Sequence, residues 1–386
     1  MARIVYKDFF DTRPDTIAGK YLRRFWHPVY RSQDLLKGRA VPIRIMHEDL
    51  TLYRGEGGAP HIVGYRCAHR GNQLSAGWVE GDSIRCFYHG WKFAQTGQCV
   101  EQPAEQRPFC EKIRIPSYPH VQEYLGMIFV YMGEGEPPPL PRYPNFESTN
   151  HAVEVERWIR PCNYFLNVEN SVDTTHVCFT HRNSRTNYGL ELDIPKIRHQ
   201  ETEWGVATYT IWADGKTRRS NFGMPYLSYV AGQISDPEVS MVEMLVIKVP
   251  IDDTSHAQFE LHKVHGKLPT SEDQRRWLER RESERKSMTP SHEELYVKIL
   301  DGKMLLKHLD PKRIDFIVLE DDVAQVGQGA TWDSWDRVDE NLGGADSGVV
   351  LIRRIWRREL EALAEGKPLK EWTYQLDMVP TGFEYV

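Results

Sequence analysis

Two short cysteine–histidine pairs constrain the fold of this chain more than any other feature. Cys67 and His69 form a C-x-H pair, and Cys86 and His89 form a C-x-x-H pair after sixteen intervening residues. Each pair offers one soft thiolate and one imidazole, and each is followed by a glycine that lets the backbone come close to a ligand. The pattern predicts two loops, at the tips of neighbouring hairpins, that meet around a metal centre.

Two kinds of metal centre suit these four ligands. A two-iron, two-sulfur cluster of the Rieske type takes two thiolates on one iron and two imidazoles on the other. A structural zinc ion takes all four donors in one tetrahedron. The flanking residues favour the cluster, because C-x-H-R-G and C-x-Y-H-G-W resemble the Rieske signature of aromatic-ring-hydroxylating oxygenases. We therefore expect one [2Fe-2S] cluster, held by Cys67, His69, Cys86 and His89.

A second group of candidate ligands lies further along the chain. Asp173 and His176 are three residues apart and Glu169 precedes Asp173 by four, so on a helix these side chains share one face. His181 follows His176 by five residues and joins them only if the helix bends or loosens there. Two imidazoles and a carboxylate with open positions form the facial triad of iron(II) oxygen chemistry. The alternative is a polar helix with two surface histidines.

The segment with these histidines resembles the mononuclear-iron motif in the phthalate dioxygenase and aromatic O-demethylase branch of the same oxygenases. In that family an aspartate far downstream is the third ligand. Aligning Gln325 and Gly327–Gly329 with the family's Q-x-G-x-G run implies Asp321, and the adjacent Glu320 and Asp322 would then support the ligands or face solvent. The resemblance thus implies one mononuclear Fe(II), held by His176, His181 and Asp321.

The same resemblance implies an activity and partners. The chain would be the terminal oxygenase component, a homotrimer that uses dioxygen and receives electrons from a separate NAD(P)H-dependent flavin reductase, with or without a ferredoxin. A separate reductase is also indicated by the sequence, because no G-x-G-x-x-G motif follows a predicted strand and no plant-type ferredoxin cysteine run is present. Asp173 would connect His89 on the cluster to His176 on the iron by hydrogen bonds, as an electron-transfer bridge.

We expect the reaction to be monooxygenation of a substituted aromatic compound that ends in O- or N-dealkylation, because E-N-x-x-D resembles the segment of O-demethylases. Two alternatives stay open, namely cis-dihydroxylation of an aromatic acid and a Rieske electron carrier without catalysis. Aromatic and soft apolar groups near predicted strand ends are expected to line the substrate pocket. These are Phe165, Phe222, Met224 and Tyr226.

The pattern of elements predicts an α+β chain. Alternating segments and hairpin turns run from Val41 to Met132, and a Gly- and Pro-rich stretch then interrupts regular structure. Asn163–Thr180 and Ser347–Ala364 predict helices, and Ser271–Lys286 predicts a charged helix with a solvated face. We expect an N-terminal segment that packs on the catalytic domain (1–40), an all-β Rieske domain (41–133), a Pro-rich linker (134–148) and a catalytic domain (149–386). The resemblance makes the last a helix-grip fold, an antiparallel sheet plus helices.

Composition excludes other partners. The formal net charge of -6 argues against nucleic acid, whose binding needs clustered Lys and Arg. The first residues carry charges where a signal peptide needs an apolar stretch. The most apolar segments are far shorter than the roughly 20 residues that span a bilayer. We expect a cytoplasmic protein, with neither nucleic acid nor a membrane as its partner.

Overall fold

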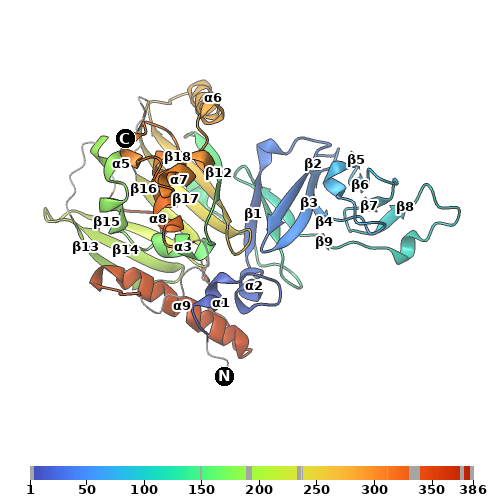
Figure 1. Ribbon diagram of the computed structural model, residues 1–386, viewed down its shortest axis with the longest axis horizontal. Coiled ribbons are helices and arrows are strands. Elements are labelled where there is room, and N and C mark those ends of the chain that lie inside the picture. The colour runs from blue at the N-terminus through green and yellow to red at the C-terminus, as the bar shows by residue number, and fades with distance from the viewer. Residues whose placement is uncertain are drawn as a thin grey trace. The chain divides into compact units, whose positions relative to one another are not determined.

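The computed structural model of the chain describes residues 4–147, 150–187, 194–232, 236, 238–310, 312–329, 340–373 and 378–382. These residues form two units (Figure 1). The N-terminal unit contains residues 12–141 and 249–252, and the C-terminal unit contains residues 4–11, 142–248 and those from 253 onward.

The division of the chain can be compared with the expected domain bounds. The boundary after residue 141 falls inside the expected linker, 134–148. Of the expected N-terminal segment, 1–40, residues 4–11 belong to the C-terminal unit, whereas residues 12–40 belong to the N-terminal unit.

Three antiparallel sheets of short strands build the N-terminal unit, which confirms the predicted all-β domain. Their orders are β1-β11-β10, β2-β3-β4-β9 and β5-β6-β7-β8, and the short helix α2 (Ile17–Leu22) precedes them. The strands are β1 (Trp26–Arg31), β2 (Ala40–Ile45), β3 (Glu48–Arg54), β4 (Pro60–Gly64), β5 (Trp78–Glu80), β6 (Ser83–Arg85), β7 (Lys92–Ala94), β8 (Cys99–Glu101), β9 (Ser117–Tyr118), β10 (Val121–Tyr124) and β11 (Met127–Tyr131).

Tight turns set the register of these strands. Met46 and His47 join β2 to β3 with φ of 45° and 66°, which suits a two-residue hairpin whose twist matches the strands. The core beneath the hairpins contains the thiols of Cys67 and Cys86 beside large apolar side chains, among them Tyr53, Val63, Leu74, Ile84, Trp91 and Phe93. The two loops with candidate ligands are therefore anchored in the core of the unit.

A seven-stranded antiparallel sheet organises the C-terminal unit, in the order β12-β18-β17-β16-β15-β14-β13. The sheet and its helices confirm the predicted α+β catalytic domain. The strands are β12 (Val153–Arg160), β13 (Lys196–Glu201), β14 (Gly205–Ile211), β15 (Thr217–Gly223), β16 (Leu227–Gly232), β17 (Val239–Pro250) and β18 (His256–Gly266).

Helices flank this sheet (Figure 1). Helix α3 contacts both α8 and α9, and α9 also contacts β13. Within the described ranges, no helix combines the length and the apolar composition that a membrane span needs. The helices are α1 (Lys7–Phe10), α3 (Tyr164–Asn170), α4 (His176–Phe179), α5 (Arg182–Asn187), α6 (Ser271–Ser287), α7 (His292–Leu300), α8 (Phe316–Val326) and α9 (Ser347–Ala364).

The predicted helix over Asn163–Thr180 is helical only in parts. Helix α3 ends at Asn170, and α4 begins at His176. Between them Asp173 accepts hydrogen bonds from the backbone amides two and three residues further on (3.0 and 3.4 Å). Such side-chain bonds to the local backbone compete with a helix. Because of this break, the side chains of α3 and those of α4 do not belong to one continuous helix.

The prediction that Ser271–Lys286 presents only a solvated face is wrong. This segment is helix α6, and its Trp277 is 1% exposed within an apolar cluster of the C-terminal unit. Arg285 reaches the buried carboxylates of Glu154 and Glu156 on β12, and Arg281 also contacts Glu156 (3.4 Å). The sequence shows no apolar stripe for this side of α6, because its buried positions include arginines in place of aliphatic residues.

Candidate active site

The two cysteine–histidine loops have the same backbone construction. In each loop the cysteine amide donates to a carbonyl five residues further along, at 2.8 Å in both cases. A glycine amide donates back to the cysteine carbonyl, at 2.9 Å for Gly71 and 3.1 Å for Gly90. Both glycines have positive φ, 72° and 77°, a conformation that favours glycine. The loops thus turn Cys67 and Cys86 inward in the same way.

The two loops bring thiol next to thiol and imidazole next to imidazole. The Cys67 and Cys86 thiols are buried neighbours, and burial, with a further contribution from Cys86, raises the pKa of Cys67 to about 11. Such a thiol stays protonated unless a metal cation binds it. The His69 and His89 rings are 4.6 Å apart between centroids, and His69 also stacks on Trp91.

His69 supplies a direct test of fit. Its buried Nδ1 has no hydrogen-bond partner among the residues that the structure describes. A buried polar nitrogen left without a partner is costly, and coordination to a metal ion would satisfy it. Two adjacent thiols and two adjacent imidazoles fit a cluster that takes thiolates on one iron and imidazoles on the other.

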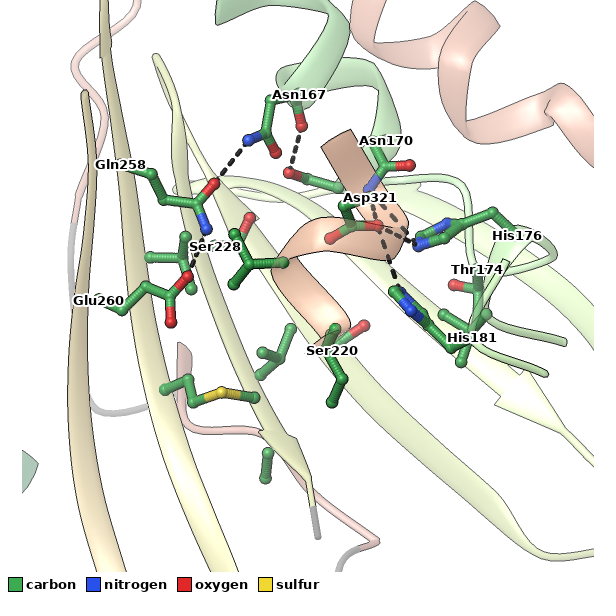
Figure 2. A pocket seen from close by; sticks show the side chains of 18 of the residues that line it. Asn167, Asn170, Thr174, His176, His181, Ser220, Ser228, Gln258, Glu260 and Asp321 are labelled. Atoms are coloured by element: carbon green, nitrogen blue, oxygen red, sulfur yellow. Dashed lines mark hydrogen bonds and ion pairs between the residues drawn. The ribbon is translucent and has the colours of Figure 1, made fainter. Parts of the chain in front are cut away.

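In the C-terminal unit, His176, His181 and Asp321 come together. One ligand atom from each lies within 4.8 Å of the others, and Asp321 Oδ1 is 3.3 Å from His181 Nε2 and 3.7 Å from His176 Nε2. Figure 2 shows both imidazoles pointing at the Asp321 carboxylate, with Asn170 Nδ2 3.5 Å from the same oxygen. The three side chains come from α4, the turn after it and α8, so they converge only in the tertiary structure.

Neighbouring groups hold the two imidazoles in a defined orientation. Nδ1 of His181 lies 3.0 Å from Glu320 Oε2, which also accepts from the Ser184 hydroxyl at 2.8 Å. Nδ1 of His176 contacts the backbone carbonyl of Asp173. Both rings therefore present Nε2 to Asp321, an arrangement in which outer hydrogen bonds fix the tautomer of a metal ligand.

The electrostatics of the triad suit a cation. Burial alone would raise the pKa of Asp321, but His181 and His176 lower it well below its usual range. Burial likewise opposes the charged form of His181, yet Asp321 and Glu320 raise its pKa to about 9. The carboxylate is thus ionised, and a metal ion can take the position that the imidazolium proton now fills.

The carboxylates on either side of Asp321 have other partners. Asp322 is fully buried and contacts the guanidinium of Arg160 and the imidazole of His292. Glu320 is also fully buried. Of the two expected roles, Glu320 has the supporting one, since it contacts His181, and neither carboxylate faces solvent. Asp321 is the carboxylate that α8 turns toward the two histidines.

Glu169 does not share a face with Asp173. It accepts a hydrogen bond from the Tyr6 hydroxyl (2.8 Å) and is paired with Arg353, so it ties α1 and α9 to α3. The sequence argument assumed one continuous helix, and the break after Asn170 separates the two carboxylates. Asp173 itself lies in the wall of the cavity described next.

A cavity of about 420 Å3 adjoins the triad. Its wall includes His176, His181 and Asp321, and its apolar part includes Val230, Met244 and Val246. Figure 2 shows the cavity between α8 and the strands of the sheet, with the polar side chains of Ser220, Ser228, Gln258 and Glu260 along it. The volume is in the range of small-molecule sites.

The four residues expected to line the pocket do not line this cavity. Phe165 packs in an aromatic cluster, 4.9 Å from the Phe9 ring and 5.3 Å from the Trp356 ring between centroids. Phe222, Met224 and Tyr226 are buried near the junction of β15 and β16. The residue type and the position near a strand end do not decide which side chains face a cavity, because that depends on how the elements pack in the tertiary structure.

Several charged residues of the cavity wall escaped sequence reasoning. Glu260 and His262 are on β18, Glu156 is on β12, and Lys248 is on β17. Burial would lower the pKa of His262, but the carboxylates around it raise it to about 10. Acidic residues alternating on strands, as at Glu154 and Glu156, are a signal that could have pointed to a polar interior face.

Comparison with known proteins shows to which family the chain is related. Residues 25–119 match the family model of the Rieske [2Fe-2S] domain. The chain is 28% identical over 385 residues to the 5,5'-dehydrodivanillate O-demethylase oxygenase subunit of Sphingobium sp. (strain NBRC 103272 / SYK-6), covering 92% of this chain and 80% of that protein. It is 30% identical over 373 residues to the phenoxybenzoate dioxygenase subunit alpha of Ectopseudomonas oleovorans, covering 91% and 83%.

Solved structures show the same fold at lower identity. NdmA of Pseudomonas putida CBB5, in a mutant with theobromine, superposes with a TM-score of 0.62 at 20% identity, covering 89% of this chain and 92% of that one. The oxygenase of carbazole 1,9a-dioxygenase, in a reduced complex with its ferredoxin, gives a TM-score of 0.62 at 20% identity, covering 90% and 93%. The chain belongs to the family of Rieske non-haem iron oxygenases that act on aromatic compounds, as an oxygenase component with a [2Fe-2S] cluster and a mononuclear iron.

Proposed function

We propose that this oxygenase dealkylates a substituted aromatic compound, by monooxygenation of an O- or N-alkyl group that then leaves as an aldehyde. The observation that carries the proposal is the cavity whose wall combines His176, His181 and Asp321 with apolar side chains. Similarity to an O-demethylase oxygenase subunit over most of both chains supports dealkylation. For a methoxy group, one dioxygen, two electrons and two protons would give the phenol, formaldehyde and water.

The second candidate is cis-dihydroxylation of an aromatic acid. Similarity to a phenoxybenzoate dioxygenase subunit supports it. In that reaction both oxygen atoms enter the ring and no carbon is lost, whereas dealkylation releases the alkyl carbon. The products therefore separate the two candidates.

The cluster ligands and the iron ligands would have different roles. When bound, the cluster supplies electrons one at a time and the mononuclear iron supplies a site at which dioxygen is activated. Glu320 and the Asp173 carbonyl orient the imidazoles so that Nε2 of each faces the metal position. The apolar wall limits the water that reaches the site. The cluster ligands would be Cys67, His69, Cys86 and His89, and the iron ligands His176, His181 and Asp321.

We also propose that electrons arrive from an NAD(P)H-dependent reductase through a ferredoxin and that the oxygenase is a homotrimer. The solved oxygenase–ferredoxin complexes of carbazole 1,9a-dioxygenase, which share the fold, support a ferredoxin. In the trimer, Asp173 would accept an N–H from His89 of a neighbouring copy. The two backbone amides that bind Asp173 Oδ1 fix the carboxylate, and this supports its use of the other oxygen as a bridge.

Turnover on a substrate panel tests the reaction. The oxygenase, a reductase and a ferredoxin are incubated with methoxy- and N-methyl-substituted aromatics and with aromatic acids that have no alkyl group. Formaldehyde in step with substrate loss supports dealkylation, and a cis-diol supports the alternative. Asp321→Ala, with its cluster spectrum intact, is the control. If no substrate gives either product while the cluster still exchanges electrons, the protein would be an electron carrier without catalysis.

Complementation tests the proposed electron path. Homotrimers of Cys67→Ser (cluster lost) and of His176→Ala (iron lost) should each be inactive. Co-expressed chains should recover part of the activity, because some pairs of neighbours combine an intact cluster with an intact iron site. Verified mixed trimers without any activity, although their remaining metals are fully loaded, would contradict transfer between chains.

A further inference from the structure

A buried lysine faces the same cavity as the triad. Lys248 lies on β17, and alternate residues of a strand point to one face, so its side chain follows those of Met244 and Val246. All three line the cavity whose wall also contains His176, His181 and Asp321. Lys248 and the candidate metal ligands therefore border one cavity.

The surroundings of Lys248 do not neutralise its charge. The side chain is 1% exposed, its Nζ donates to the Ser228 hydroxyl at 2.6 Å, and it lies 6.0 Å from the centroid of the Phe222 ring. Among the described residues, no carboxylate lies within the 4.0 Å of an ion pair with it. Other buried cations of the unit have such partners, as Arg160 has Asp322 and Lys263 has Glu243.

An amine in this position destabilises the folded state. Burial lowers the pKa of Lys248 to about 7, although Glu260 partly opposes the effect. An ammonium without a counter-charge loses hydration that a single neutral hydroxyl does not replace. A methionine would fill a similar volume without that cost. A lysine at this position is therefore best explained if a bound ligand supplies the group that pairs with its amine.

We propose that Lys248 and Ser228 form a subsite that anchors an acidic oxygen substituent of the substrate, either a carboxylate or a phenolic hydroxyl. The inference rests on the proposed function in taking the substrate to be aromatic. A carboxylate would pair with the ammonium form of Lys248. A phenol, whose ordinary pKa of about 10 lies above that of this amine, would instead donate its O–H to the neutral amine in a hydrogen bond. The Ser228 hydroxyl can donate to the same oxygen. Met244 and Val246, next on the same face, provide an apolar surface for the ring.

Calorimetric titration of the holoenzyme tests the subsite independently of turnover. The probes are two matched pairs, 4-methoxybenzoate with 4-methoxybenzamide, and 4-methoxyphenol with 4-methoxytoluene. The wild type should bind the acidic member of at least one pair about 30-fold more tightly or better, the smaller end of the effect expected for a buried charged pair. The pair that shows the preference identifies the substituent. In Lys248→Met the difference should shrink to within about 3-fold.

Lys263→Met is the matched control. Lys263 is also a buried lysine of the sheet, but it lies on β18, is paired with Glu243 (3.4 Å) and does not line the cavity. Its replacement should leave the preference for acidic ligands unchanged. Lys248→Met should melt at the temperature of the wild type or above it, because it removes a buried amine whose hydrogen-bond partner among the described residues is one hydroxyl.

Three results would overturn the subsite. They are no preference for either acidic probe in the wild type, an undiminished preference in Lys248→Met, and equal losses of affinity for acidic and neutral probes in that variant. A clear fall in the melting temperature of Lys248→Met would also overturn it, in favour of a structural lysine. A wild type that keeps the preference but forms neither formaldehyde nor a diol would reject the proposed reaction and leave the subsite standing.

Discussion

Replacing Asp322 by alanine should destabilise the C-terminal unit strongly, although Asp322 is not a candidate metal ligand. Its carboxylate is fully buried between Arg160 and His292, and Arg160 is itself 0% exposed. After the replacement, the nearest carboxylate to Arg160 is Asp321, whose Oδ2 is 4.0 Å from Nη2. Removing one partner of a buried ion pair costs about 3–5 kcal/mol, because the other charge stays behind.

The magnitude can be expressed as a melting temperature. A unit of this size loses roughly 2–4 °C per kcal/mol, so Asp322→Ala should melt roughly 6–20 °C below the wild type. Asp321→Ala keeps the Arg160–Asp322 pair and should melt close to the metal-free wild type, but it should lose the mononuclear iron. Thermal unfolding followed by circular dichroism gives the first quantity, and iron per chain gives the second. Visible absorbance of the cluster serves as the internal control in both variants.

The two adjacent aspartates should therefore give opposite outcomes. A melting temperature of Asp322→Ala within about 2 °C of the wild type would show that the buried pair does not stabilise the unit. Retention of iron by Asp321→Ala together with its loss from a folded Asp322→Ala would show that α8 presents the other carboxylate to the histidines.

Three other predictions test separate parts of the molecule. Cys67→Ser should remove the visible colour and the electron paramagnetic resonance signal of the reduced cluster while leaving mononuclear iron in place, since a hard oxygen replaces a soft thiolate; a coloured variant would contradict the ligand assignment. Glu320→Ala should weaken iron binding about 10–100-fold by releasing His181, measured by competition with a chelator in the folded protein; unchanged affinity would contradict a positioning role. The raised pKa of His262, about 10 against an ordinary 6.5, stabilises the fold fully below pH 6.5, so the free energy of unfolding should fall by up to about 1.4 kcal/mol per pH unit between pH 6.5 and 10. His262→Gln should flatten that slope in urea titrations at several pH values, and an unaltered slope would place its origin elsewhere.

Much of the metal chemistry was readable from the sequence. The four cluster candidates occupy two short segments, so their residue types and spacing survive as a local pattern. The same holds for His176 and His181. Each loop is also a short-range structure, in which a glycine and a backbone hydrogen bond turn the cysteine inward without help from distant elements. The fold class followed from strand alternation and from resemblance, and the sheets and helices confirm it.

Asp321 marks the limit of that approach. Resemblance selected it from three adjacent acidic residues, and its register could not be derived from spacing alone. In the structure one turn of α8 sends Glu320 to His181 and Ser184, Asp321 to the cavity, and Asp322 to Arg160. Three like charges in a row can be told apart only when the elements packed around the helix are known.

The sequence by itself determined which metals and which chemistry the chain can support, because ligand sets are local and chemically specific. Only the tertiary structure decided where the cavity lies and what lines it. Phe165 looked like a pocket residue and is in an aromatic cluster with Phe9 and Trp356, whereas Lys248, an unremarkable residue of an apolar strand, lines the same cavity as the triad. The reason is physical: a cavity wall is assembled from one face of several strands and a helix far apart in the chain. The face that each strand presents depends on the register of its neighbours, which no single segment encodes.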